Sequence, residues 1–101
     1  MAELLDDEAI DVALASLPGW QRVDKTLVKD VPVDGDEADR LEAAVANAAD
    51  ELNHHPVVDR SQGAVRFTVW THSAGGITGK DVALATRIDE AIGGATAGPP
   101  A

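Results

Sequence analysis

The stretch AVRFTVWT, residues 64–71, alternates between apolar and polar positions, and this alternation restricts the fold more than any other feature of the chain. Successive side chains of a β-strand point to opposite faces, so the pattern predicts a strand with one face toward a core. The core face would consist of Val65, Phe67 and Val69. Arg66, Trp70 and His72 fall on the other face, which places His72 at a strand end and away from the core.

Three further segments have the composition of short strands. Two of them lie on either side of a tight connection: WQRVD, residues 20–24, and LVKDVPV, residues 27–33. Pro32 makes the end of the second of these strands an edge or a bulge. Residues 56–61 form the third, and a Gln-Gly turn joins them to the strand of residues 64–71. The sequence therefore predicts two pairs of strands with links of hairpin length.

Helical periodicity appears in three other places. The first helix follows the acidic start DDE and is stopped by a Pro-Gly pair, and the second ends at or just before Asn53. Thr78 opens the third helix in a capping box with Asp81. The predicted helices span residues 6–17, 36–52 and 78–92.

The element order is helix, strand, strand, helix, strand, strand, helix. An α+β fold follows, with a four-stranded antiparallel sheet and three helices on one face. The 101 residues suffice for one domain, which we expect to cover residues 1–93. The remainder, residues 94–101, has the composition of a disordered tail.

The charge balance excludes several classes of function. Eighteen acidic residues against eight basic ones give a formal charge of −10, which disfavours direct binding to nucleic acid. Such a surface is typical of adaptation to high salt, and an ordinary acidic protein is as good an interpretation. Cysteine is absent, no signal peptide is recognisable and no apolar run could span a membrane, so we expect a soluble cytoplasmic protein.

All three histidines of the chain, His54, His55 and His72, lie within nineteen residues. Imidazole changes its charge near neutral pH, so the cluster indicates acid–base chemistry or metal binding. Asp50 lies four residues before His54, where its carboxylate could accept an imidazole N–H and orient the ring. For any single histidine, simple stabilisation by the end of a helix is the competing explanation.

A metal site is the weaker hypothesis, because adjacent histidines lack the i, i+3 or i, i+4 spacing that aligns two ligands on a helix. A purely structural explanation is also available for two other candidates. Asp81 would then be a helix cap and nothing more, and Lys80 a solvated charge of the first turn. Trp70 could be half-buried surface or an aromatic wall beside His72.

A family resemblance is carried by the run D-E-L-N-H-H-P from Asp50, then V-x-F-x-V-x-T-H, G-G-I-T-x-x-D and L-A-x-x-I. It resembles the signature of the pterin-4a-carbinolamine dehydratases, closely over residues 50–92 and more loosely before them. Members of this family have three helices against one face of a four-stranded antiparallel sheet. The chain departs from the family pattern where members commonly carry aromatic residues, for example at Val58 and Gln62.

The resemblance implies a dehydratase that converts 4a-hydroxytetrahydropterin to quinonoid dihydropterin and water, without a metal or other cofactor. It implies His54 and His72 as the proton-transfer pair and His55 as a substrate-binding or auxiliary residue. Asp50 would be the orienter. The expected substrate-binding residues are Asp50, Trp70, Lys80 and Asp81.

The resemblance also implies partners. A homodimer or a dimer of dimers is expected, because a four-stranded sheet exposes two edges, and an aromatic-amino-acid hydroxylase could supply the pterin. The alternative function is a non-catalytic, protein-binding dimer of the same fold, acting as a coactivator or an assembly chaperone. The retained histidines favour the enzyme, because a scaffold has no need of three imidazoles.

Overall fold

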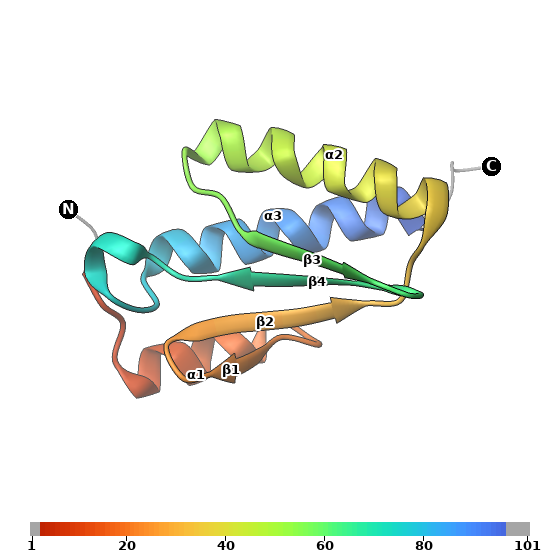
Figure 1. Cartoon of the computed structure of the whole chain (residues 1–101). Coiled ribbons are helices and arrows are strands. Elements are labelled where there is room, and N and C mark those ends of the chain that lie inside the picture. Colours follow the sequence, from red (N-terminus) through yellow and green to blue (C-terminus); the bar gives the residue numbers. More distant parts are fainter. Residues whose placement is uncertain (1–2, 97–101) are drawn as a thin grey trace.

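The computed structural model describes residues 3–96, with three helices, four strands and one short 3₁₀ helix among them (Figure 1). The element order agrees with the prediction from sequence. In chain order the elements are α1 (Asp7–Ala15), β1 (Gln21–Val23), β2 (Thr26–Val31), α2 (Gly35–Leu52), β3 (Val57–Ser61), β4 (Ala64–Val69), η1 (His72–Ala74) and α3 (Gly79–Thr96).

The sheet is antiparallel throughout, with the strand order β1-β2-β4-β3. Two hairpins therefore meet along β2 and β4, and β1 and β3 form the edges. The helices lie on one side of the sheet, where α2 and α3 pack against each other (Figure 1). The predicted α+β fold, with three helices on one face, is confirmed.

The core lies between the helices and one face of the sheet. Leu27 pairs with Val69 and Val31 with Val65, and all four side chains are buried. This inward row of β4 is the apolar set predicted from the alternation, and Phe67 at its centre has no exposed surface. The outward row of the same strand consists of half-buried and exposed residues, and Trp70, which directly follows β4, is half-buried as well.

The end of α2 departs from helical geometry at Asn53. This residue adopts the left-handed conformation, with φ 53° and ψ 42°, and the His54 N–H donates to the carbonyl of Ala49 at 3.0 Å. A hydrogen bond that spans five residues around a left-handed residue is the Schellman arrangement. The chain direction therefore changes immediately before His54.

The start of α3 is the predicted cap. The Asp81 carboxylate accepts the backbone N–H of Thr78 at 2.9 Å, and the Thr78 hydroxyl accepts that of Lys80 at 3.2 Å. Two of the backbone donors near the helix start are thereby satisfied.

The far end of α3 differs from the sequence prediction. The helix continues to Thr96, past the expected domain boundary at residue 93, so residues 94–96 are helical. The predicted helix ends at residue 92, immediately before two consecutive glycines, but a glycine lowers helix stability by only about 1 kcal/mol relative to alanine. The rest of the expected tail, residues 97–101, lies outside the described residues.

All residues of the edge strand β3 are exposed, including Val57 and Val58 at 42% and 36%. One side of β3 pairs with β4, and the backbone groups on its other side face outward. Within residues 3–96, no helix is long and apolar enough to cross a membrane.

Candidate active site

His72 is positioned where β4 gives way to the 3₁₀ helix. The Thr71 N–H donates to the Gly76 carbonyl at 2.8 Å, and Gly75, with φ 74°, turns the chain back in a conformation that suits glycine. His72 is exposed, and its ring lies 4.4 Å from that of Trp70 between centroids, tilted by 48°. The predicted position of His72 at the strand end, on the side of Trp70, is confirmed.

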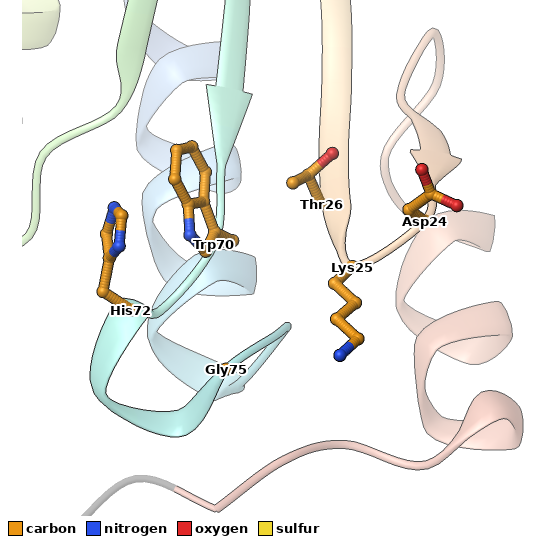
Figure 2. Close-up of a pocket in the computed structure, with 6 residues that line it drawn as sticks. All are labelled: Asp24, Lys25, Thr26, Trp70, His72 and Gly75. Atoms are coloured by element: carbon orange, nitrogen blue, oxygen red, sulfur yellow. The ribbon is translucent and has the colours of Figure 1, made fainter.

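Together with the β1–β2 turn, these two aromatic rings line an open cleft of about 650 Å³ (Figure 2). Trp70 and His72 form one side, and Thr26 with its neighbours in the turn forms the other. The lining residues are Asp24, Lys25, Thr26, Trp70, His72 and Gly75.

His54 lies outside the set that lines this cleft and makes a buried contact instead. Its Nε2 is 2.6 Å from Oδ1 of Asp81, and the exposed fractions of the two side chains are 13% and 0%. An imidazole that gives its Nε2–H to a carboxylate keeps Nδ1 for a second partner. Asp81 thus fixes the orientation of the His54 ring, and it leaves Nδ1 as the ring nitrogen available to a second partner.

The other oxygen of Asp81 belongs to a buried chain of hydrogen bonds. Oδ2 accepts the Thr71 hydroxyl at 2.8 Å and the Thr78 N–H at 2.9 Å. Because Thr71 has one hydroxyl hydrogen and gives it to the carboxylate, the 2.8 Å contact between the two threonine hydroxyls takes its hydrogen from Thr78. Each hydrogen bond in this buried network is therefore donated in the direction of Asp81, whose carboxylate oxygens act only as acceptors.

His55 forms a separate pair with Asp50. Its Nε2 is 2.9 Å from Oδ1 of Asp50, and the two side chains are 59% and 74% exposed. The expected contact between Asp50 and His54 is therefore wrong. The one-turn spacing holds only inside a helix, and the left-handed Asn53 directs His54 toward α3 instead.

Two predicted substrate-binding residues have other positions. Asp81 has no exposed surface, so its carboxylate contacts His54 and not a ligand in the cleft. Lys80 is exposed and is not among the lining residues. The lysine that does line the cleft is Lys25, which sequence reasoning missed because a charged residue in a hairpin turn has an ordinary explanation as a solvated loop residue.

The three histidines do not gather around one point with other ligands. Within residues 3–96, no group of three or more His, Cys, Asp or Glu side chains is arranged to hold a metal ion. His54 and His55 each have an aspartate of their own, and His72 has an aromatic neighbour. The arrangement offers imidazole acid–base groups, one of them held by a buried carboxylate.

Comparisons with known proteins agree on one family. The family model described as pterin 4 alpha carbinolamine dehydratase matches residues 3–91. A protein of Nocardia farcinica named "Putative pterin-4-alpha-carbinolamine dehydratase" is 45% identical over 89 residues, covering 87% of this chain and 94% of its own. A protein of the same name from Mycobacteroides abscessus is 45% identical over 94 residues, covering 89% and 97%.

A solved structure is similar across nearly the whole fold. The crystal structure of a transcriptional coactivator/pterin dehydratase from Brucella melitensis superposes with a TM-score of 0.84 at 30% sequence identity. The match covers 88% of this chain and 98% of that chain.

Proposed function

The chain belongs to the pterin 4 alpha carbinolamine dehydratase family, and we propose that His54 and His72 carry the two proton transfers of its dehydratase reaction. The substrate is a 4a-hydroxytetrahydropterin, and the products are a quinonoid dihydropterin and water. The bond between the ring carbon and the hydroxyl oxygen breaks, so the oxygen must receive a proton. A ring nitrogen must lose a proton as the new double bond forms.

The observation that carries the assignment of His54 is its contact with the buried Asp81 carboxylate. A positioned imidazole is typically worth about 10²–10⁴-fold in a step that moves a proton. The carboxylate favours one tautomer of His54 and stabilises the imidazolium that forms when the ring takes a proton.

His72 and Trp70 support the placement of the pterin. The cleft that they line is large enough for a bicyclic ring, and the Trp70 indole provides an apolar wall for it. His54 is linked to this wall through Asp81, because the Thr71 hydroxyl that contacts the carboxylate belongs to the residue between Trp70 and His72. We place the pterin at the edge of the cleft, between His72 and the exposed part of the His54 ring.

His55 has an auxiliary role in this proposal. Its exposed pair with Asp50 leaves the ring free to reorient toward a ligand, because an exposed ion pair contributes little to stability. His55 would therefore contribute to substrate affinity more than to the chemical step.

The test measures dehydration of a 4a-hydroxytetrahydropterin by the purified protein in the presence of a chelator. His54→Ala and His72→Ala should each lower kcat by roughly 10²-fold or more, since each removes a proton-transfer group. His55→Ala should mainly raise KM. Circular dichroism of each variant controls for folding.

Two results would contradict the assignment. If both alanine variants kept the full rate, the histidines would not be the catalytic groups. If the wild-type protein dehydrated none of several pterins, the protein-binding alternative would replace the enzyme, and the coactivator named in the Brucella melitensis structure would then be the better guide.

Assembly and location complete the proposal. The exposed edge strand β3, with its two valines and its outward backbone groups, supports a homodimer or a dimer of dimers. We also propose that the protein acts in the cytoplasm. An aromatic-amino-acid hydroxylase is the proposed source of the pterin. Light scattering at micromolar concentration should give at least a dimer mass, and a monomer would contradict the assembly.

A further inference from the structure

Lys25 occupies the side of the cleft that faces the aromatic rings. Figure 2 shows its side chain extending toward Gly75, whereas the Asp24 carboxylate points the opposite way. The two residues lie in the turn between β1 and β2, where Asp24 adopts a left-handed conformation with φ 53°. The backbone of the turn therefore separates the ammonium group from the carboxylate next to it in sequence.

Lys25 also lacks an ion-pair partner among residues 3–96, although the chain has 18 acidic residues and eight basic ones. Five of the basic side chains lie within 4.0 Å of a carboxylate: Arg22, Lys29, Arg60, Arg66 and Arg87. No such pair occurs for Lys25, Arg40 or Lys80 in the described part of the chain. Lys25 is the one of these three that lines the cleft.

A second cavity of about 200 Å³ adjoins the cleft and shares Lys25 and Gly75 with it. Its remaining wall is mainly apolar and includes one further cation, Arg22. Lys25 therefore borders both the cleft beside Trp70 and His72 and the adjoining, mainly apolar cavity.

We propose that the cleft selects pterins whose side chain carries an anionic group, and that Lys25 is the residue that determines this specificity. This inference rests on the proposed function, which seats the pterin ring beside Trp70 and His72. A lysine ammonium is a point charge that pairs with either a carboxylate or a phosphate. The chain's charge of −10 repels anions at long range, but charges beyond about 8 Å are largely screened at physiological salt. The nearby ammonium group of Lys25 therefore determines whether the cleft attracts an anion.

The test compares the binding of three stable oxidised pterins to the full chain by calorimetry. The ligands are 6-hydroxymethylpterin, which is neutral, its phosphate ester, and 6-carboxypterin. The wild-type protein should bind at least one of the two anionic ligands roughly fivefold more tightly than the neutral one, as a charge-assisted contact allows. The two anionic ligands together show whether a phosphate or a carboxylate is preferred.

Two variants identify the responsible charge. Lys25→Gln should abolish the preference, because it removes the ammonium group from an exposed turn with little effect on folding. Arg40→Gln removes another unpaired cation, one outside the cleft, and should leave the preference unchanged. The preference of the wild-type protein should also decrease as the salt concentration is raised.

The outcomes separate the inference from the proposed function. If dehydratase activity is absent but the preference depends on Lys25, the proposed function fails and the anion-binding cleft stands. If the protein is an active dehydratase but binds the three ligands equally, or if Lys25→Gln keeps the wild-type preference, the inference is wrong and the proposed function stands. If none of the ligands binds, the inference is overturned as well.

Discussion

His54 and His55 are neighbours in the sequence, and each ring contacts one aspartate, at 2.6 and 2.9 Å, yet the two pairs lie in opposite environments. The His54–Asp81 pair is almost completely removed from solvent, and the carboxylate accepts two further hydrogen bonds. The His55–Asp50 pair is mostly exposed. The two contact distances are similar, so distance does not distinguish the pairs. The burial of His54 and Asp81 is what allows that pair to hold its imidazole ring in one orientation.

The physical reason is the cost of losing a partner. A buried carboxylate cannot exchange a lost hydrogen bond for one to water, so its donors hold each other in a single arrangement. An exposed carboxylate makes that exchange readily, and its pair is screened by salt. The comparison leads to four predictions, ordered from the largest expected effect to the smallest.

The largest difference between the two pairs should appear in stability. Asp81→Ala leaves His54, the Thr71 hydroxyl and the Thr78 N–H without their acceptor in a buried site. We expect a loss of about 3–5 kcal/mol in the free energy of unfolding. Asp50→Ala should change it by about 0.5 kcal/mol or less. Urea denaturation measures both values, and equal losses in the two variants would contradict the contrast in burial.

The second prediction concerns catalysis and uses an amide of the same shape. In Asp81→Asn, the side-chain oxygen can still accept from Thr71 and Thr78, which directs the amide N–H toward His54. Nε2 would then have to accept a hydrogen bond, and the proton of the ring would move to Nδ1. Reversal of the tautomer should lower kcat about 10-fold or more with little change in KM.

Asp50→Asn is the matched control for this tautomer effect. It should leave kcat within about twofold of the wild-type value, because the pair it alters is solvated. A pH–rate profile adds a readout that a purely structural role would not change: the profile should shift in Asp81→Asn and not in Asp50→Asn. Identical profiles for the wild type and Asp81→Asn would show that Asp81 serves only as a helix cap.

These two aspartates also show what the sequence could and could not predict. The cap formed by Asp81 follows from local spacing, because Thr78 and Asp81 belong to one helical turn. Its contact with His54 joins residues that are 27 positions apart, and it depends on how α2 and α3 pack. The sequence left open whether Asp81 is a helix cap or a site residue, and the buried carboxylate both accepts the cap hydrogen bond and contacts His54.

The fold was predictable because its elements obey simple periods. The alternation in β4 identified the core face of the sheet, and links of hairpin length gave the antiparallel pairing. The contact partner of His54 was predicted wrongly because a single left-handed residue, Asn53, ended the helical spacing between Asp50 and His54. Lys25 was missed because a turn residue acquires its significance only from the cleft that the tertiary structure places beside it.

The third prediction uses salt to separate buried from exposed electrostatics. With a formal charge of −10, the folded chain repels itself, so the thermal midpoint should rise by several degrees as KCl increases into the molar range. The effect of Asp50→Ala should vanish in molar KCl, whereas that of Asp81→Ala should persist. A midpoint that is flat or falls with salt would remove the argument from self-repulsion.

The smallest effect should come from an exposed pair on the open face of the sheet. The Arg66 guanidinium donates two hydrogen bonds to Asp30, at 2.7 and 3.0 Å, and this holds the pKa of the Asp30 carboxyl below its usual range. A carboxyl whose pKa is lower in the folded state than in the unfolded state stabilises the fold above its unfolded pKa of about 3.9. That contribution is lost as the pH falls through the folded pKa.

Arg66→Gln should therefore lower the thermal midpoint slightly at pH 6, and the difference from the wild type should disappear at acid pH, where Asp30 is protonated in both states. Because both side chains are more than half exposed, solvent screens the pair and the shift should be smaller than that of any buried-pair variant. NMR titration of Asp30 provides the direct measurement, since its pKa should rise toward the ordinary value in Arg66→Gln. An unchanged pKa would show that the guanidinium contact does not persist in solution, and the exposed pairs of this protein would then contribute even less than the comparison with Asp81 assumes.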